Sequence, residues 1–518
     1  MTKKGFGLHG AAMLLGGATL ISQVLGLVRD RLLAGTFGAS TTLDIYYAAF
    51  RIPDLIFISV GSLMAVTVLV PLLVQFSEEG NGETLSRFLS SVLTVFSASL
   101  ILFAILAYFA MPHLASYVAP GFGEKELAVL VGLSRLLLLS PLLLGLSNLF
   151  GSLLQARHRF LAYAIAPILY NVGIIVGIVL FYPMFGIYGL AGGVILGASM
   201  HLAVQFFGCR IGGQNIKVVG FTMSVDWKAT GLVFSRSLPR AIAMGANQLA
   251  LIFLIAYASK LSEGSIAIFN LSFNLQSVPM ALIGVSYSVA SFPTMVKKLA
   301  EKEPSVFVTY IHRVMGNVVF FSLPVVALFV VLRKEIVMTV LGTGSFGGVA
   351  ISTTASALAI FSIAVVFQNI ILLLDRSYYG KGISSVPVIT NIVGAITTIG
   401  VGYFLFNVYH SVLVLPLAFL FGVLANMASE WFCFRRDFGA IWKGSRALIL
   451  GESVIFAIVV GAVAGEVLDR VSSLYPATSS LGAFTNGGVA GVVGILVGVL
   501  VLKVIGSKQL SSIINSKS

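Results

Sequence analysis

Long apolar runs separated by short polar segments make up most of this chain. Because roughly 20 consecutive apolar residues are enough to cross a bilayer, we count fourteen candidate spans. The loops are short, and the longest, around residues 210–228, is too small for a soluble domain. The pattern predicts an all-α polytopic membrane protein with about 14 transmembrane helices. The approximate centres of the spans are Leu20, Ile58, Leu100, Leu139, Val172, Leu196, Gly245, Ala281, Phe321, Phe361, Ala395, Phe419, Phe456 and Gly494.

The composition supports this class of protein. The 518 residues are 58% hydrophobic and only 10% charged, which is more apolar surface than a soluble protein can bury. The net charge of +13 does not indicate a nucleic-acid partner, because the basic residues stand singly or in pairs between apolar runs. Cys209 and Cys433 show no pairing pattern, so neither a disulfide nor a metal site is expected. Lys3 and Lys4 precede an apolar run too long for a signal peptide, which predicts a retained first helix.

The distribution of Lys and Arg predicts the topology. With the N-terminus in the cytoplasm, 21 of the 32 basic residues fall on the cytoplasmic side and five on the outer side. This asymmetry follows the positive-inside rule and predicts that both termini are cytoplasmic. Six arginines remain at or near membrane depth, where charge is costly and marks an interior pathway. They are Arg29, Arg31, Arg51, Arg135, Arg236 and Arg240.

An internal repeat indicates how the spans are organised. Pro167 and Asn171 in the fifth span recur as Pro387 and Asn391 in the eleventh, 220 positions later. Residues 71 and 293 are a second pair of prolines, 222 positions apart. Chance matches occur in apolar sequence, but two concordant offsets favour a repeat. Six spans separate the copies, so we expect two six-helix lobes related by an axis along the membrane normal, with a central cleft. The predicted parts are residues 1–210 (N-lobe), 211–228 (cytoplasmic linker), 229–436 (C-lobe) and 437–518 (a helix pair).

Arg29 and Asp30, near the end of the first span, are the first candidate site residues. Either they form a local ion pair near the outer helix end, or Arg29 binds a substrate anion while Asp30 orients it. The planar guanidinium suits phosphate because it donates two parallel hydrogen bonds. Position in the sequence does not separate these two hypotheses.

Three further arginines are candidates for the same anion site. Arg236 and Arg240 are four residues apart, so they share one face of the seventh span, with Pro239 between them. They bind an anionic ligand or a partner helix, or they lie at the cytoplasmic interface if that span starts later. Arg51, with Asp54, flanks Pro53 and indicates a cleft-facing break in the second span.

Polar side chains elsewhere have less specific interpretations. Asn270 and Asn274 are four residues apart in the eighth span, where amides either join helices or bind a sugar or peptide. Asp44 precedes the second span and is predicted to be solvated. Glu430 and Glu452 lie near cytoplasmic helix ends, which favours an interface position.

No enzymatic centre is indicated. The chain has no GxxxxGK[ST], HExxH or GxSxG motif, and its six histidines are scattered. A membrane glycosyltransferase would need a large outer loop with catalytic acids or histidines, which the loop lengths exclude. We therefore expect a transporter with no cofactor, although a cation or the membrane potential can drive transport.

Several motifs resemble those of one family, the MurJ/MviN lipid II flippases of the multidrug/oligosaccharidyl-lipid/polysaccharide exporter superfamily. They are Leu25-Gly26-Leu27-Val28-Arg29-Asp30, Phe37-Gly38-Ala39-Ser40 with Asp44, Ala49-Phe50-Arg51-Ile52-Pro53-Asp54-Leu55, His158-Arg159-Phe160 with Ala166-Pro167 and Asn171, and Leu275 to Pro293. The resemblance covers essentially the whole chain. The chain departs from the family where cations are usual, at Gln23, Phe57 and Asn274. Arg236 and Arg240 are candidates to replace that charge.

The resemblance implies an alternating-access flippase that moves undecaprenyl-pyrophosphate-linked peptidoglycan precursor (lipid II) from the inner to the outer leaflet. The implied location is the bacterial cytoplasmic membrane, and membrane lipids and cell-wall synthesis proteins are the implied partners. The alternatives are a flippase for another polyprenyl-linked oligosaccharide and a cation-coupled drug exporter. The drug exporter would need an acidic, aromatic cleft, whereas the candidates here are mainly basic and amide residues.

Overall fold

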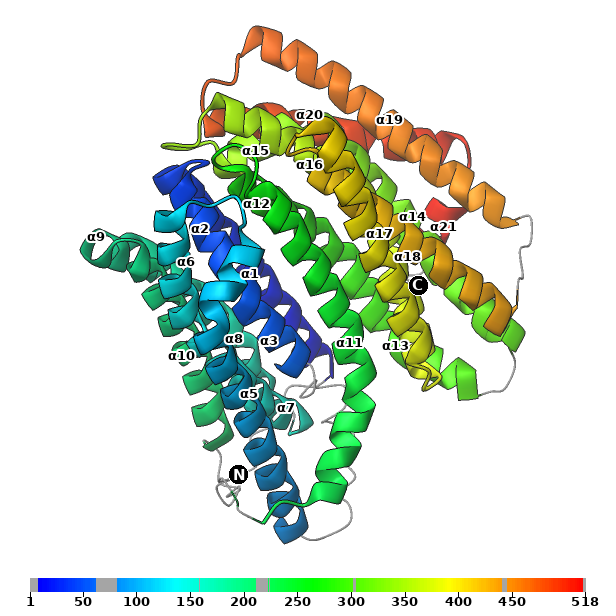
Figure 1. Cartoon of the computed structure of the whole chain (residues 1–518). Helices are drawn as coiled ribbons and strands as arrows, with labels where there is room; N and C mark the ends of the chain where they lie inside the picture. The colour runs from blue at the N-terminus through cyan, green and yellow to red at the C-terminus, as the bar shows by residue number, and fades with distance from the viewer. Residues whose placement is uncertain are drawn as a thin grey trace. The chain divides into compact units, whose positions relative to one another are not determined.

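The computed structural model describes residues 8–61, 82–157, 159–210, 222, 224–300, 304–439 and 445–515, and the regular structure of these residues is entirely helical (Figure 1). The elements up to residue 258 are α1 (Leu8–Phe37), α2 (Thr41–Ala49), α3 (Arg51–Gly61), α5 (Gly82–Val118), α6 (Glu124–Leu137), α7 (Leu139–Ala156), α8 (Phe160–Val176), the π-helical η2 (Gly177–Phe181), α9 (Tyr182–Phe185), α10 (Ile187–Arg210) and α11 (Trp227–Ala258). The later elements are α12 (Ser265–Pro279), the π-helical η3 (Met280–Val285), α13 (Ser286–Ala300), α14 (Pro304–Val331), α15 (Arg333–Leu341), α16 (Gly348–Gly380), α17 (Ser385–Tyr409), α18 (Val414–Phe438), α19 (Ser445–Leu474), α20 (Ser480–Val504) and α21 (Lys508–Asn515).

Each of the fourteen predicted span centres lies in one of these helices. In the part of the chain that the structure describes, eleven helical segments are long and apolar enough to cross a membrane. They hold eleven of the predicted centres, and α1, α3 and α19 hold the other three. The predicted all-helical polytopic class is therefore confirmed.

The outer surfaces of the helices are apolar, as hydrocarbon surroundings require. On α5, Leu102 and Phe109 are exposed, and on α20, Leu496 and Leu500 are exposed. Apolar patches of this extent are rare on soluble monomers, because water makes them unfavourable. The buried face of α20 consists mainly of small residues, among them Gly487, Gly491 and Gly494, which is the packing typical of helices whose solvent is lipid.

Contacts divide the chain into two compact units. The first comprises Met1–Leu33 and Thr41–Lys260, and the second comprises Ala34–Ser40 and Leu261–Ser518. The last turn of α1 belongs to the second unit because the Ser345 N–H donates to the Gly35 carbonyl (2.8 Å). In the first unit α11 packs on α3 and α5, and in the second α17 packs on α18 and α19 on α20. The lobe boundaries expected at residues 210, 229 and 436 stay a prediction.

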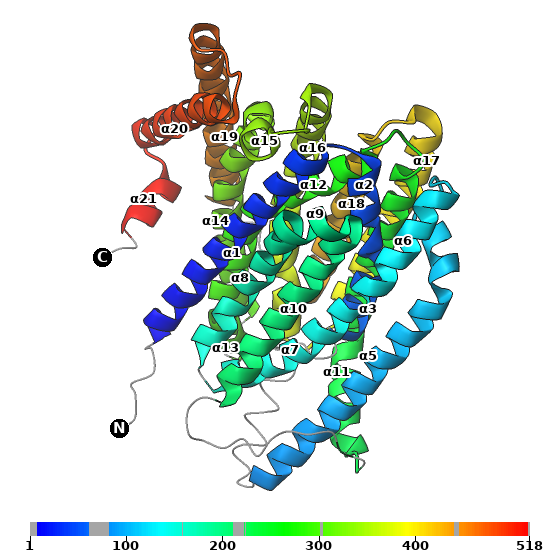
Figure 2. The ribbon, with the colours of Figure 1, turned by 90° about the vertical axis from the view of Figure 1, so that its left-hand side faces the viewer.

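Glycines set the closest helix packing in the first unit, between α8–η2 and α10, which run side by side (Figure 2). Gly173 faces Gly197, and Gly177 faces Gly193. A Cβ atom on any of the four would overlap main-chain atoms of the facing helix. Small residues at such spacing let helix backbones approach without side chains between them.

The predicted repeat has a matching local geometry in both units. Asn171 Nδ2 donates to the Pro167 carbonyl (3.2 Å) in α8, and Asn391 Nδ2 donates to the Pro387 carbonyl (2.7 Å) in α17. Each amide thus returns to the carbonyl four residues earlier, at the turn where proline loosens the helix. The second proline pair has one member, Pro71, outside the described residues.

The Glu452 carboxylate holds the C-terminal helix α21. It accepts hydrogen bonds from Ser507 Oγ (2.5 Å) and from the main-chain N–H groups of Lys508 and Gln509 (both 3.2 Å). A carboxylate at a helix N-terminus satisfies free N–H donors and complements the helix dipole. The Glu452 side chain is buried as this cap, and its expected position near the cytoplasmic interface stays a prediction.

A methyl group at Gly193 is expected to separate α8–η2 from α10. Gly193→Ala should lower the free energy of unfolding by about 1–3 kcal/mol, because the new Cβ overlaps the Gly177 backbone. The midpoint of thermal unfolding in detergent measures this loss. Gly192→Ala is the matched control, since its Cβ meets only Phe181 Cδ2, at 3.4 Å. Equal midpoints for the two variants would contradict the packing argument.

Candidate functional site

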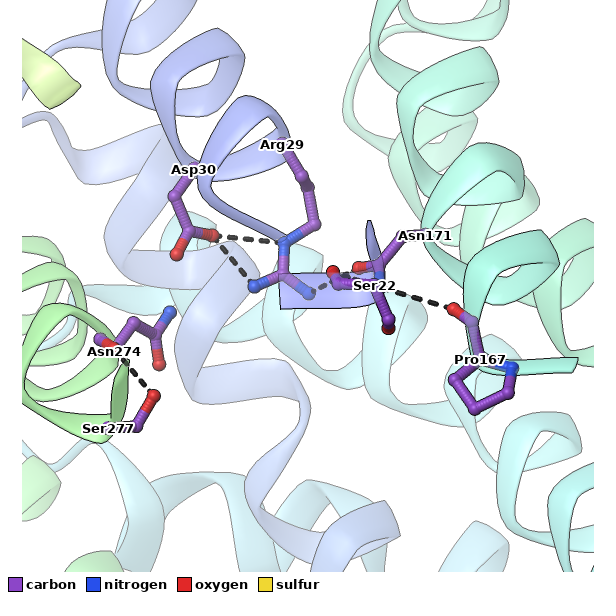
Figure 3. A network of polar contacts seen from close by, with 7 residues as sticks. All are labelled: Ser22, Arg29, Asp30, Pro167, Asn171, Asn274 and Ser277. Atoms are coloured by element: carbon purple, nitrogen blue, oxygen red, sulfur yellow. Dashed lines mark hydrogen bonds and ion pairs between the residues drawn. The ribbon is translucent and has the colours of Figure 1, made fainter. Parts of the chain in front are cut away.

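The first unit brings Arg29 and Asp30 of α1 together with Asn171 of α8 (Figure 3). Arg29 Nε and Nη2 both donate to Asp30 Oδ1, at 2.9 and 2.8 Å, and Arg29 Nη1 donates to Asn171 Oδ1 at 3.3 Å. Arg29 and Asp30 therefore form the ion pair that the sequence suggested. The pair is also tied across to another helix, which the sequence did not show.

Asn171 is the centre of this network. Its Nδ2 group donates toward the Ser22 carbonyl (3.3 Å), Ser22 Oγ (3.2 Å) and the Pro167 carbonyl (3.2 Å), while its Oδ1 accepts from Arg29. One amide therefore fixes α1 at two turns, at Ser22 and at Arg29. The sequence identified Asn171 only as a marker of the repeat, although a buried amide recurring at a fixed spacing was a usable signal.

The Arg29 guanidinium keeps hydrogen-bonding capacity for a ligand. A guanidinium has five N–H donors, and three are used by the bonds to Asp30 and Asn171. The Arg29 side chain is 23% exposed, whereas the Asp30 side chain is 3% exposed. An anion can therefore reach the arginine, while the carboxylate stays behind it as an orienting group.

Tyrosines of α2 connect this pair to a second one. Arg51 and Asp54 of α3 interact electrostatically with each other. Tyr47 interacts with Asp30, Arg29 and Arg51, and Tyr46 with Arg29 and Asp54. The structure thus gathers three predicted site residues, Arg29, Asp30 and Arg51, around the buried ring pair of α2.

The sequence analysis missed the α2 tyrosines because no sequence motif marks them. In addition, a short helix between two spans is not distinguished from a loop by its apolar pattern. Asp44 of α2 is a related error. It was predicted to be solvated, but it is buried, because α2 packs along α6 inside the first unit.

Arg236 and Arg240 lie in the first half of α11, which continues through Pro239 as one helix of 32 residues. Counting about 20 residues back from Ala258 for a bilayer core places Arg240 at its edge and Arg236 one turn beyond it. The helix length thus favours the interface hypothesis for both. Their role in anion binding stays a prediction.

Asn270 and Asn274 belong to α12 in the second unit. Asn270 is buried, and its Nδ2 donates to the Ile266 carbonyl (2.7 Å) of its own helix. The main-chain carbonyl of Asn274 accepts from Ser277 Oγ (2.6 Å; Figure 3). The bond within the helix favours a structural role for Asn270, and a substrate role for either amide stays a prediction.

The second unit sets two acids side by side, the buried Glu430 and the partly buried Asp375. Glu430 of α18 is 0% exposed, because α16 packs over it and sets the Asp375 carboxyl beside it. Its expected position near the cytoplasmic interface stays a prediction. Among the described residues, neither carboxylate oxygen of Glu430 accepts a hydrogen bond. Two carboxylates in contact repel strongly in a low-dielectric interior. A shared proton or a bound cation removes that repulsion.

Comparison with known proteins identifies the family. A sequence model of the family described as "Lipid II flippase MurJ" matches residues 33–484. The chain belongs to the lipid II flippase MurJ family. This confirms the resemblance seen in the sequence and makes the protein a transporter rather than an enzyme. As a family member with many apolar helices, it is a multi-pass protein of the inner membrane.

Similar curated MurJ proteins cover most of the chain. A probable lipid II flippase MurJ from Rhizobium tropici is 26% identical over 92% of this chain and 90% of its own length. Lipid II flippase MurJ from Burkholderia cenocepacia is 25% identical over 73% of this chain and 74% of its own length.

Solved structures share the fold. A structure of lipid II flippase MurJ in an inward closed conformation aligns with a TM-score of 0.76, at 19% identity, over 95% of this chain and 99% of that chain. An inward-facing MATE-family multidrug resistance transporter of the MOP superfamily aligns with a TM-score of 0.69, at 14% identity, over 83% and 98% of the two chains. The expected two-lobe architecture of this superfamily is therefore confirmed.

Removing the Asn171 amide is expected to loosen α1 from α8. Asn171→Ala leaves one Arg29 donor and the Ser22 acceptors without this partner, so it should cost about 1–3 kcal/mol of stability. Ser22→Ala is the control, because the Ser22 main-chain carbonyl still accepts from Asn171. Thermal unfolding of the purified variants makes the comparison. If Asn171→Ala were as stable as Ser22→Ala, the amide would not be the centre of the network.

Proposed function

We propose that this chain flips lipid II from the inner to the outer leaflet by alternating access, and that Arg29 contacts the pyrophosphate of the substrate. The observation that carries the residue assignment is the Arg29 side chain, which is held by Asp30 and Asn171 yet retains unused donors and exposure. Pyrophosphate oxygens are acceptors that match a planar guanidinium fork. Family membership supports lipid II as the substrate.

Asp30 tunes how strongly the site holds an anion. An unpaired arginine at membrane depth is costly and would bind pyrophosphate tightly. The Arg29–Asp30 pair is nearly neutral as a unit, so the empty site is tolerated and the incoming anion competes with a resident carboxylate. A transporter needs this weak, reversible binding, since it must release its substrate on the other side. Asp30 is therefore a positioning residue in this proposal.

The second pair, Arg51 with Asp54, lies around the same α2 tyrosines and extends the polar surface of the first unit. Hydroxyl groups of Tyr46 and Tyr47 are suited to hydrogen bonding with sugars or phosphate esters. We assign Arg51 to support of the site rather than direct contact, because it is buried.

We further propose that both termini are cytoplasmic, as the positive-inside rule predicts. Proteins of cell-wall synthesis are the expected partners on the basis of the substrate alone. The similarity to multidrug transporters extends to the fold and, at 14% identity, carries no argument for a drug substrate.

Two neighbouring acids of the second unit support a proposal about energy coupling. Asp375 and Glu430 share one low-dielectric site, so the pair changes its charge when a proton or a monovalent cation arrives or leaves. Moving one charge through 100 mV of membrane potential is worth about 2.3 kcal/mol. A charge change at this pair would therefore link transport to the ion gradient.

Complementation tests the Arg29 assignment. In a strain depleted of its own lipid II flippase, Arg29→Ala should fail to restore growth, because charge-assisted hydrogen bonds of about 1.5–3 kcal/mol are lost, which is a fall of roughly 10–100-fold in flipping. Arg29→Lys should retain partial function, since the charge remains and the fork does not. Arg135→Ala is the control, because the contacts of Arg135 among the described residues are a hydrogen bond to the Tyr108 carbonyl and stacking over the Tyr108 ring, both away from Arg29. Normal flipping by well-expressed Arg29→Ala would mean that the Arg29–Asp30 pair has a structural role only. Failure of the unaltered chain to complement would contradict the assignment of lipid II as the substrate.

Glu430→Gln tests the coupling proposal. We expect wild-type flipping in proteoliposomes to respond to an imposed proton or sodium gradient, and the variant to lose most of that response, because an amide at position 430 neither exchanges a proton nor supplies a negative charge to a cation. Glu466→Gln is the control, since Glu466 is exposed and paired with Arg470. An unchanged gradient response in Glu430→Gln would exclude the acid pair as the coupling site.

A further inference from the structure

A recess lies between α14 and α18 in the second unit. Both helices pack on α16, which forms the floor of the recess. Its volume is about 410 Å³. The lining consists of His312, Met315, Gly316 and Val319 of α14, Phe367 and Ile370 of α16, Leu424, Met427, Ala428 and Trp431 of α18, and Leu450 of α19.

The two helices that wall the recess run antiparallel. The ring centroids of Phe307 and Phe438 are 5.1 Å apart, and those of His312 and Trp431 are 5.8 Å apart. The first turns of α14 therefore lie beside the last turns of α18. His312 and Trp431 consequently mark one end of the recess, and its other end is apolar.

The lining changes from polar to apolar along this axis. At the first end, the His312 ring donates from Nδ1 to the Val308 carbonyl (2.8 Å), and the Trp431 indole supplies an N–H donor. At the second end, Val319 and Leu424 face each other across α16. A lining with this gradient is complementary to an amphiphile whose polar group lies at Trp431.

Two cations flank the polar end. Arg313 follows His312 directly, and Arg435 lies one helical turn beyond Trp431 on the same face of α18. Both arginines are exposed, and within the described part of the chain neither forms a hydrogen bond or an ion pair. They are therefore available to a negatively charged group.

The carboxylates at this end have partners of their own. Asp437 Oδ1 accepts from Arg436 Nε (2.8 Å), and Asp437 Oδ2 accepts from the Tyr378 hydroxyl (3.2 Å). Glu430 is buried against Asp375, on the side of α18 that faces α16. The charge offered to a ligand at the polar end is thus positive, which favours an anionic headgroup.

The mouth of the recess opens on an apolar surface. Phe421, Ala428 and Phe432 share one face of α18, and Ala428 lines the recess. All three are exposed, as is Leu450 at the opposite rim. Because α18 is long and apolar enough to cross a membrane, hydrocarbon surrounds this face and enters the recess without crossing water.

The size of the recess suits one hydrocarbon chain. A methylene group takes up nearly the same volume as a water molecule, roughly 30 Å³. A recess of about 410 Å³ therefore holds a chain of about a dozen carbon atoms but not two such chains side by side.

We propose that this recess binds one acyl chain of an anionic phospholipid, whose phosphate lies at the end marked by Trp431. The chain lies against Val319 and Leu424, and Arg313 and Arg435 meet the phosphate. The lipid fills the space that α14 and α18 leave over α16. This site lies in the second unit, and it does not require that lipid II be the transported substrate.

Quenching of Trp431 fluorescence by brominated lipid tests the proposal. The chain has three tryptophans, so Trp227→Phe together with Trp442→Phe leaves Trp431 as the single fluorophore of the whole protein. Phosphatidylglycerol or phosphatidylcholine with one brominated acyl chain is titrated into an excess of unlabelled phosphatidylcholine. We expect half-maximal quenching at a mole fraction of phosphatidylglycerol at least about fivefold lower, because one surface arginine contributes about that factor toward an anionic lipid.

A first pair of variants tests the acyl-chain contact. Ala428→Leu fills the mouth of the recess, so we expect most of the quenching by both lipids to be lost. Ala462→Leu is the matched control, because it makes the same change at an exposed position of α19 outside the lining, and it should leave quenching unchanged. If Ala428→Leu does not fold, Gly316→Val, which fills the recess from α14, takes its place.

A second pair tests the headgroup contact. Arg435→Gln should lower the preference for phosphatidylglycerol about fivefold. Lys503→Gln should keep that preference. It removes an exposed charge outside the lining, and the hydrogen bond from Ser507 to Glu452 places the end of α20 beside the start of α19, where Leu450 lies.

Each contrary outcome overturns a stated part of the proposal. Equal quenching in Ala428→Leu and Ala462→Leu would mean that bromine reaches Trp431 only from the surrounding bilayer. Equal quenching by the two lipids, or equal losses in Arg435→Gln and Lys503→Gln, would reject the headgroup contact. Stronger displacement by undecaprenyl phosphate than by unlabelled phosphatidylglycerol would mean that the recess takes a polyprenyl tail instead of a phospholipid chain.

Discussion

The requirement that a charge at membrane depth be balanced by a nearby group organises the first unit. Arg29 lies in the first long helix, where hydrocarbon cannot solvate it, so Asp30 balances its charge and Asn171 satisfies a further donor. Asn171 in turn fixes α1 through Ser22 and returns to the proline turn of its own helix. Helix position, ligand capacity and fold therefore depend on the same few hydrogen bonds.

Close packing makes that arrangement possible. Facing glycines let α10 approach α8–η2 at backbone distance, so the helix that carries Asn171 is held firmly from its far side. In lipid, helices gain little from excluding apolar surface, and tight backbone contact with hydrogen bonds has to supply the association. This packing supports the helix that presents Asn171 Oδ1 to the Arg29 guanidinium.

The sequence allowed the helices and the family to be predicted, because span length and apolar runs are local properties. The Arg29–Asp30 pair could also be predicted, because its members are adjacent in the sequence. The same is true of the Pro–Asn repeat, because its geometry is set within one helix turn. The burial of Asp44 and the pairing of Asp375 with Glu430 could not be predicted from the sequence. Those depend on which helix packs over which face, and an apolar run does not specify its neighbours.

The carboxylate beside Arg29 also determines how the proposed transport site would work. Arg29 has this carboxylate of its own chain at 2.8 Å, so a visiting anion must compete with a permanent partner and can leave again. Reversible binding of this kind suits a transported headgroup, because a transporter has to release what it binds. An arginine at membrane depth without such a partner would hold the anion more strongly and release it more slowly.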